Sequence, residues 1–257
     1  MTPIVVVKIG TNLLTTEDRR LDLNNLRDLV HQICDELDRG QFQVVVVTSG
    51  AITCGAERMG FIPKTVPEKQ AAAAVGQILL MQEYARFFGG RGRAVGQLLL
   101  TKDGLENEIV RHNTQNTLAH LMKHGVVPIV NENDSVATNE IGPKFGDNDE
   151  LSAVVARLLS ARRLILLSDI EGVFTDNPKS NPKATLITEI NQIDDAILNM
   201  AKDVQNGRSR GGMASKLNAA KDASEAGIEV VIAHGRRAGI VSAIQRGDQV
   251  GTKVGAQ

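Results

Sequence analysis

Six short runs of apolar, mostly β-branched residues recur along the chain, and they constrain its fold more than any other feature. Each run is nearly continuous rather than alternating, which is typical of strands in a parallel sheet that is buried on both faces. The runs cover residues 3–10, 42–50, 94–100, 126–134, 163–169 and 228–235. They predict a core built around a mainly parallel sheet.

Helical patterns lie between these runs. Two of them repeat apolar residues at the spacing of one helix face. They are Leu26, Leu29, Val30, Ile33 and Leu37 in one segment, and Leu151, Val154, Val155, Leu158 and Leu159 in the other. Gly40 marks the end of the first helix. The alternation predicts an α/β fold, a three-layer αβα sandwich around a mainly parallel sheet with right-handed crossovers.

Composition narrows the class of protein. The 257 residues are 42% hydrophobic and 23% charged with a formal net charge of −1, as in an ordinary globular protein. No basic footprint for nucleic acid or an anionic membrane is present. The first apolar run is interrupted at Lys8, far too early for a signal peptide or a membrane span. Cys34 and Cys54 form no CxxC motif, which favours a reducing, cytoplasmic setting.

Polar and glycine residues follow five of the six runs at the point where the strand ends. In open α/β sheets, ligands bind outside these carboxyl ends. Any one group taken alone is better explained as a simple turn, but the set indicates a shared site. The groups are Lys8 with Gly10, Thr11 and Asn12; Ser49 with Gly50 and Ala51; Thr101 to Asp103; Asn131 to Asp134; and Ser168 with Asp169.

Asp147, Asn148, Asp149 and Glu150 stand side by side just ahead of the second helical pattern. A helix N-terminus needs one capping residue, and carboxylates there complement the helix dipole. Three acids and an amide exceed that need. The surplus carboxylates could orient lysines, hold Mg²⁺ indirectly or grip a substrate ammonium.

Glycine-bearing segments at 48–55 and 209–227 could cradle anions, and the second carries Lys216 near the start of a helical pattern. Neither is a P-loop, and no GxGxxG follows the first strand. Lys8 interrupts a buried strand, so its ammonium needs an anion nearby. Two lysines, glycine cradles and clustered carboxylates are the parts that phosphoryl transfer requires.

These segments resemble the amino acid kinase family, in the family's order and across essentially the whole chain. The segments are VVVKIGTNLLT, VVVVTSGAI, KQAAAAVGQ, VGQLLLT, VVPIVNENDSVAT, FGDNDELSA, LLSDIEGVFTDNP, RGGMASKLNAA and VGTKV. The resemblance implies a carbamate kinase-like fold as a single domain over residues 1–257. Residues up to about 150 would bind the acceptor, and residues from about 151 onward would bind the nucleotide.

Within the family, NENDSVAT and GDNDELSA are most similar to the members that act on L-glutamate. The resemblance implies transfer of the ATP γ-phosphoryl group to the glutamate side-chain carboxylate, giving glutamyl 5-phosphate on the way to proline. Mg²⁺ would arrive with ATP. Proline as a feedback inhibitor, hand-over of the product to glutamyl phosphate reductase, and a homo-oligomer (dimer or tetramer) are further implications.

The resemblance also assigns roles to residues of this sequence. The catalytic group would be Lys8, Lys216, Asp149, Gly10 and Gly50, and the acceptor would be bound by Ser49, Ala51, Asn131, Asp134, Asp147 and Asn148. The nucleotide would be bordered by Lys8, Thr11, Ser168, Asp169, Arg210, Gly211, Gly212, Met213, Ala214, Ser215 and Lys216. Arg210 stands where the family usually has a small residue, and Ser168 where it usually has Thr.

Two alternatives stay open. One is a sister kinase acting on acetylglutamate, aspartate or a nucleoside monophosphate. The other is a non-catalytic regulator that binds a nucleotide or amino acid, which would have little use for both lysines and Asp149. His120 and His124 are four residues apart, but without a supporting ligand they are expected to be ordinary surface or core residues rather than a metal site.

Overall fold

The computed structural model describes residues 2–136, 148–178, 180–203 and 212–255, without the side chains of 201–203. Within this part of the chain, eight strands form one sheet, and six of them are parallel neighbours. In spatial order the strands are β3 (Val95–Leu100), β4 (Val127–Glu132), β2 (Gln43–Val47), β1 (Ile4–Ile9), β5 (Arg163–Ser168), β9 (Glu229–His234), β10 (Thr252–Val254) and β8 (Glu189–Ile190).

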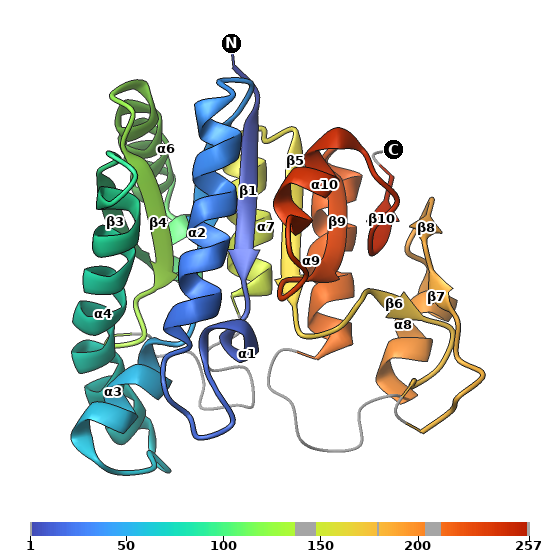
Figure 1. The fold of residues 1–257 in the computed structure, drawn as a ribbon, viewed down its shortest axis with the longest axis horizontal. Coiled ribbons are helices and arrows are strands. Elements are labelled where there is room, and N and C mark those ends of the chain that lie inside the picture. Colours follow the sequence, from blue (N-terminus) through green and yellow to red (C-terminus); the bar gives the residue numbers. More distant parts are fainter. Residues whose placement is uncertain (1, 137–147, 179, 204–211, 256–257) are drawn as a thin grey trace.

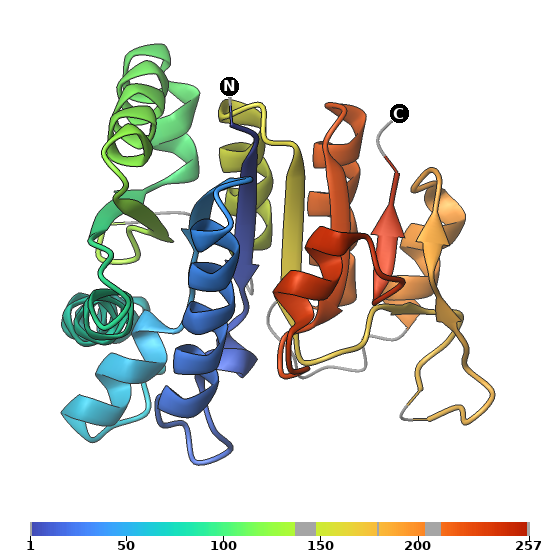
Figure 2. The same ribbon diagram turned by 45° about the horizontal axis from the view of Figure 1, so that its top comes forward.

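Helices cover both faces of this sheet (Figures 1 and 2). One face carries α2 (Leu23–Asp38), α4 (Val66–Gly89) and α10 (Ile240–Arg246). The other carries α5 (Lys102–Glu106), α6 (Glu108–Lys123), α7 (Asp149–Leu158) and α9 (Met213–Glu225), with α8 (Asp195–Asp203) beside α9. The short α1 (Thr11–Leu14) and α3 (Ala51–Met59) follow β1 and β2. The predicted three-layer αβα sandwich with a mainly parallel sheet is confirmed.

The six predicted strands form the continuous parallel part of the sheet. Shorter strands were not foreseen: β10 runs antiparallel to β9, and β6 (Val173–Phe174) pairs with β7 (Leu186–Ile187) in a small separate ribbon. These elements have only two or three residues each, too few for a recognisable pattern. Among the described helices, none is both long enough and apolar enough to cross a bilayer.

The pleat of β1 decides which layer each side chain enters, because successive residues of a strand point to opposite faces. Val5, Val7 and Ile9 pack against the α2 and α4 layer. Val6 packs in the layer of α7 and α9. Lys8 has the same parity as Val6, so its long side chain leaves the central strand towards α7 and α9.

Helices α3 and α4 cross in close contact through two glycines. A Cβ on Gly55 would lie 1.7 Å from the carbonyl oxygen of Ala72, and one on Gly76 would lie 1.7 Å from that of Ala51. No side chain fits at either position, so the two helix backbones touch. This contact brings the middle of α4 against the first turn of α3, directly after β2.

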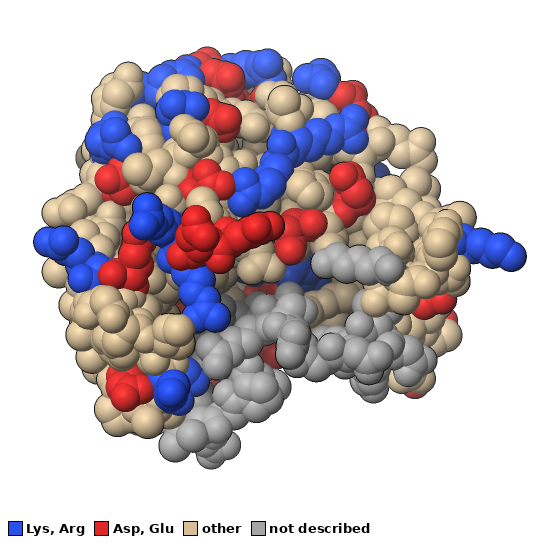
Figure 3. Space-filling model, turned by 60° about the horizontal axis from the view of Figure 1, so that its bottom comes forward, with Lys and Arg blue, Asp and Glu red and all other residues tan. Residues whose placement is uncertain are grey.

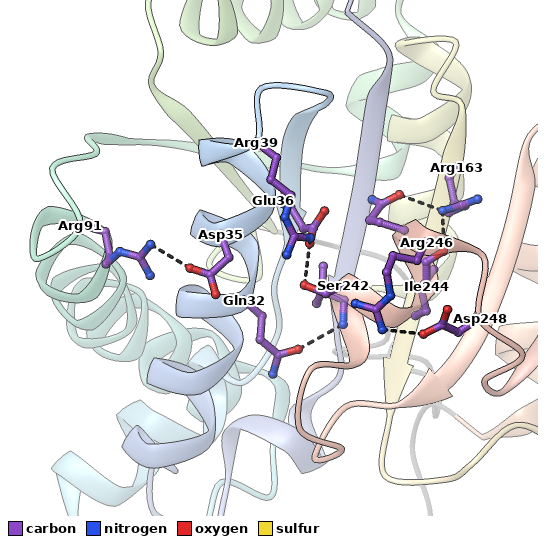
Figure 4. Close-up of polar contacts among 12 residues, drawn as sticks. Gln32, Asp35, Glu36, Arg39, Arg91, Arg163, Ser242, Ile244, Arg246 and Asp248 are labelled. Carbon is purple, nitrogen blue, oxygen red and sulfur yellow. Dashed lines mark hydrogen bonds and ion pairs between the residues drawn. The ribbon is translucent and has the colours of Figure 1, made fainter.

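Polar contacts hold the C-terminal half of α2 against its neighbours (Figure 4). Gln32 Oε1 accepts a hydrogen bond from the backbone N–H of Val241 at 3.1 Å, and buried Glu36 accepts one from Ser242 Oγ at 2.5 Å. Arg91, just after α4, donates to Asp35 at 2.8 Å. These contacts join α2 to α10 and to the end of α4 in the same layer. None of them involves a residue at the carboxyl end of a strand.

Candidate active site at the carboxyl ends of the strands

The carboxyl ends of the parallel strands meet along one edge of the sheet, which is the lower edge in Figure 1. Strand β1 lies between β2 and β5. The strands that follow β1 in the sequence, β2 to β4, are added on one side of it, and the chain then crosses over to add β5 and β9 on the other side. Such a switch point is where open α/β sheets leave a crevice for ligands. Figure 3 looks onto this edge, and the Lys, Arg, Asp and Glu side chains visible there are intermingled rather than gathered into a field of one sign.

Two lysines from distant parts of the sequence share one carboxylate at this edge. Lys8 contacts Oδ1 of Asp149, and Lys216 Nζ donates to Oδ2 of the same side chain at 3.0 Å. All three side chains are buried, with exposed fractions of 3% for Lys8, 4% for Lys216 and 0% for Asp149. The three groups bring two positive charges against one negative charge into a space shielded from water.

The fold places each member of this trio at the end of an element. Lys8 is the second-last residue of β1, Asp149 begins α7, and Lys216 lies in the first turn of α9. Burial by itself would raise the pKa of Asp149, but the ammonium groups of Lys8 and Lys216 outweigh it and hold that pKa below its ordinary value. The carboxylate therefore stays ionised and keeps both lysines in position.

Glycines occupy the turns that follow β1 and β2 at this edge. Gly10 has ordinary extended backbone angles, and a Cβ there would sit 3.3 Å from the carbonyl oxygen of Leu167 and 3.8 Å from Lys8 Nζ. Gly50 precedes α3 with φ of +95°, a left-handed conformation that suits glycine. Small residues at both turns allow a ligand to approach the backbone. Ala51 and Thr11 begin the helices that follow, α3 and α1.

Buried amides connect the ends of β2 and β4 to the start of α7. Asn148 Nδ2 donates to Asn131 Oδ1 at 2.6 Å and also to the carbonyl oxygen of Thr48. Asn131 Nδ2 in turn donates to Gln77 Oε1, in the middle of α4, at 3.1 Å. The structure thus brings the predicted residues Asn131 and Asn148 together and joins them to Gln77.

Three buried polar atoms in this neighbourhood have no hydrogen-bond partner among the described residues: Ser49 Oγ, Asp134 Oδ1 and Asn148 Oδ1. Burial, reinforced by the charge of Glu132, raises the pKa of Asp134 to about 7. Buried polar groups in folded proteins are nearly always paired. Unpaired oxygens at the mouth of a sheet are therefore candidates for contact with a ligand.

A second group of predicted residues lies around the ends of β5 and α9. Ser168 Oγ donates to Asp169 Oδ1 at 3.1 Å, and Asn12 Nδ2 donates to Asp169 Oδ2 at 3.0 Å. Gly212 is the N-cap of α9, and Met213, Ala214, Ser215 and Lys216 form its first turn. Asp147, Arg210 and Gly211, also predicted as site residues, lie outside the described residues.

The sequence patterns gave no role to Gln77, although it closes one of the segments that carry the family resemblance. Gln77 is the one amide in the stretch AAAAVGQILL and has an exposed fraction of only 6%. A polar residue in an apolar stretch of helix is a usable signal, because burying it requires hydrogen-bond partners. Among the described residues there is no group of three or more His, Cys, Asp and Glu side chains that could hold a metal ion.

Comparisons with known proteins place this geometry in a family. The chain belongs to the amino acid kinase family, whose model matches residues 3–234. Glutamate 5-kinase of Salmonella newport is 44% identical over 255 residues, an alignment that covers 98% of this chain and 69% of that enzyme. Glutamate 5-kinase of Salmonella heidelberg matches equally well.

Solved structures share the fold at low sequence identity. UMP kinase from Bacillus anthracis superposes with a TM-score of 0.68 at 17% identity, covering 99% of this chain and 96% of that one. Isopentenyl phosphate kinase from T. acidophilum superposes with a TM-score of 0.62, also at 17% identity, covering 98% and 99%. At this identity the likeness shows the fold alone, which is shared by kinases with different acceptors.

Proposed function

We propose that the protein is an ATP-dependent kinase that phosphorylates the side-chain carboxylate of L-glutamate, giving L-glutamyl 5-phosphate and ADP. The observation that carries the proposal is the shared carboxylate of Asp149 between Lys8 and Lys216 at the switch point of the sheet. The 44% identity to a glutamate 5-kinase along nearly the whole chain supports glutamate as the acceptor.

The proposed reaction has simple bond changes. A side-chain oxygen of glutamate attacks the γ-phosphorus of ATP, a new O–P bond forms, and the bond to the β-phosphate oxygen breaks so that ADP leaves. Both reactants are anionic, so their repulsion must be offset. A carboxylate is already an adequate nucleophile, and no covalent enzyme intermediate is needed. Catalysis then consists of positioning and charge stabilisation.

In this proposal Lys8 and Lys216 stabilise the negative charge on the phosphoryl group as it moves from donor to acceptor. Asp149 is the positioning residue, because each of its two oxygens holds one ammonium. Gly10 and Gly50 would let the reacting oxygens approach the backbone, because neither residue carries a side chain. The low solvent exposure of the trio strengthens these electrostatic interactions.

The proposed acceptor pocket lies around the carboxyl ends of β2 and β4. The unpartnered oxygens of Asp134 and Asn148 suit the α-ammonium of glutamate, and Ser49 Oγ can donate to a carboxylate. Acetylglutamate lacks a free ammonium, and a nucleoside monophosphate carries no ammonium that the buried carboxyl group of Asp134 could bind. Both are therefore poorer matches than glutamate.

In this proposal ATP would be bordered by Ser168, Asp169, Thr11 and the first turn of α9. The single domain would then have an N-terminal part that binds the acceptor and a C-terminal part that binds the nucleotide. Mg²⁺ usually binds through substrate phosphates and few protein ligands. It would neutralise charge on the phosphates when bound with ATP. Proline inhibition, hand-over to a reductase and a homo-oligomer stay predictions.

An acceptor panel tests the proposal. Purified protein is incubated with ATP and Mg²⁺ plus L-glutamate, L-aspartate, N-acetylglutamate or UMP, and ADP release is followed. Hydroxylamine traps an acyl phosphate as a hydroxamate, which distinguishes carboxylate transfer from simple ATP hydrolysis. ADP and hydroxamate forming together only with glutamate support the proposal. Stronger activity with another acceptor, or none with glutamate, contradicts it.

A further inference from the structure

We propose that Gln77 is a positioning residue for acceptor recognition. Through Asn131 it fixes the side-chain amide of Asn148, so that Asn148 Oδ1 faces the acceptor as a hydrogen-bond acceptor for its α-ammonium group. This inference rests on the proposed function, since it names the part of the substrate that this oxygen recognises. Gln77 itself does not touch the substrate.

The close crossing of α3 and α4 is what brings Gln77 to the site. Gly76 lies against the carbonyl oxygen of Ala51, at the beginning of α3. Gln77 follows directly and reaches across to the end of β4, where its Nε2 donates to the carbonyl oxygen of Glu132 at 3.2 Å. A helix that is otherwise apolar in this region thus delivers one amide to the ends of the central strands.

A chain of hydrogen bonds runs from Gln77 to the start of α7. Gln77 Oε1 accepts from Asn131 Nδ2 at 3.1 Å, and Asn131 Oδ1 accepts from Asn148 Nδ2 at 2.6 Å. Asn148 Nδ2 also donates to the carbonyl oxygen of Thr48. Gln77, Asn131 and Asn148 are buried, with exposed fractions of 6%, 2% and 2%. Water therefore competes little for these bonds.

Backbone groups fix the direction of every amide in this chain. The oxygen and nitrogen of a side-chain amide have similar shapes, so only the neighbours decide which way it points. The carbonyl oxygen of Glu132 can only accept, which turns Gln77 Nε2 towards it. The N–H of Glu132 can only donate, and it donates to Asn131 Oδ1 at 3.0 Å. The carbonyl oxygen of Thr48 can only accept, which turns Asn148 Nδ2 towards it.

As a consequence, Asn148 Oδ1 is the last atom of this chain of hydrogen bonds, and the chain provides no donor for it. It is buried and has no hydrogen-bond partner among the described residues. At neutral pH, glutamate has two carboxylates that only accept hydrogen bonds and one ammonium that donates them. A buried acceptor oxygen in the acceptor pocket therefore matches the ammonium, as does the carboxyl group of Asp134.

Loss of Gln77 would weaken this recognition without touching the lysines. Asn131 Nδ2 would lose its partner, so that only the N–H of Glu132 and the carbonyl oxygen of Thr48 would hold the amides of Asn131 and Asn148, which could then turn over more often. A reversed Asn148 would direct an NH₂ group at the substrate ammonium, and two donors repel. Binding of glutamate should suffer, whereas ATP is held by residues at the other end of the site.

The test compares Gln77→Met, which keeps the volume but removes the side-chain hydrogen bonds to Glu132, Asn131 and Gln97, with Gln82→Met. Gln82 is exposed on the same helix and serves as the matched control. We expect the KM for glutamate to rise about 10-fold or more in Gln77→Met, the equivalent of one lost hydrogen bond to a charged group. The KM for ATP and kcat should change much less, because Gln77 contacts neither the lysines nor Asp149, and Gln82→Met, a surface change, should match the wild type within about twofold.

Glutarate separates recognition from general damage, because it has both carboxylates of glutamate and no amino group. Its inhibition constant against glutamate should be the same in wild type and Gln77→Met. A parallel loss of glutarate and glutamate binding, or an unchanged KM for glutamate, overturns the inference. If Gln77→Met does not fold, Gln77→Leu takes its place: it also removes the acceptor oxygen that Asn131 Nδ2 uses, and it should also raise the KM for glutamate.

The two proposals fail in different ways. A wild-type protein without glutamate kinase activity overturns the proposed function and this inference with it. An active wild type whose Gln77 variants bind glutamate normally overturns only the role of Gln77.

Discussion

Lys216 Nζ lies 3.0 Å from Oδ2 of Asp149, so the first turn of α9 is tied to the first residue of α7 inside the protein. Lys8 contacts the other oxygen of the same carboxylate from β1. Three elements that are remote in sequence are thereby joined by a single side chain. The consequences for activity and stability can be tested separately.

Replacing Asp149 with asparagine should impair both properties. The neutral amide would leave two buried ammonium groups without their shared carboxylate, and breaking a buried ion pair in this way typically costs about 3 to 5 kcal/mol of unfolding free energy. Because the lysines lose their position, kcat should fall about 100-fold or more. Urea unfolding and ADP release measure the two effects. Glu150→Gln, at the neighbouring half-exposed position that pairs with Lys102, is the control and should change neither much.

Replacing Lys216 with methionine should lower kcat about 100- to 1000-fold, the usual cost of removing one group that stabilises transition-state charge. The KM for glutamate should stay near that of the wild type, because the proposed acceptor contacts come from other residues. Lys221→Met, further along α9, provides a matched loss of charge. Steady-state kinetics with both substrates decide the matter, and a variant that retained full kcat would remove Lys216 from the mechanism.

Glutamate binding should weaken as the pH falls below about 7, since the pKa of Asp134 is raised to about 7 by burial and by Glu132. A protonated Asp134 cannot pair with the substrate ammonium, so the KM for glutamate should rise on the acid side. Asp149 should not contribute to this change, because its pKa lies below the ordinary value. The KM of Asp134→Asn should be high and independent of pH across this range. A wild-type KM that is flat between about pH 6 and 8 would contradict the assignment.

The same raised pKa affects stability with a definite sign. The folded protein binds the Asp134 proton more tightly than the unfolded chain, whose carboxyl group titrates near 3.8. This contribution therefore favours folding at low pH and is lost as the pH rises through about 7. Asp134→Asn should accordingly raise the melting temperature at about pH 8 relative to the wild type. Equal melting temperatures at that pH would contradict this prediction, because they would show that other groups in the folded protein offset the cost of ionising the buried Asp134.

Gly76→Ala should destabilise the protein and weaken glutamate binding together. The added Cβ would lie 1.7 Å from the carbonyl oxygen of Ala51, so α4 must move away from α3 and carry Gln77 with it. Overpacking of this kind costs about 1 to 3 kcal/mol, and more where backbone is in the way. Gly89→Ala is the control on the same helix, because nothing lies within 4 Å of its Cβ position. Thermal unfolding and the KM for glutamate are measured for both.

Much of the fold follows from local patterns in this sequence. The six apolar runs become the six parallel strands because a sheet buried on both faces tolerates few polar residues along its strands. The two-residue strands and the antiparallel β10 were not predicted. Segments this short carry no pattern of their own, and they become strands only because the fold places a partner strand next to them. The polar residues that follow the strands were predicted to meet in one shared site, because the carboxyl ends of parallel strands lie at the same edge of a sheet.

The sequence by itself determined the order of strands and helices, the turns that carry polar residues, and the need of Lys8 for an anion, because these follow from side-chain polarity and spacing along the chain. The family resemblance already implied that Asp149 holds the two lysines. Only the tertiary structure decided how each oxygen of Asp149 meets one lysine and how Gln77 joins Asn131 and Asn148. The physical reason is that hydrogen bonds and ion pairs act over about 3 Å. Crossovers, pleat parity and the glycine contact between α3 and α4 bring residues from remote parts of the chain within that range.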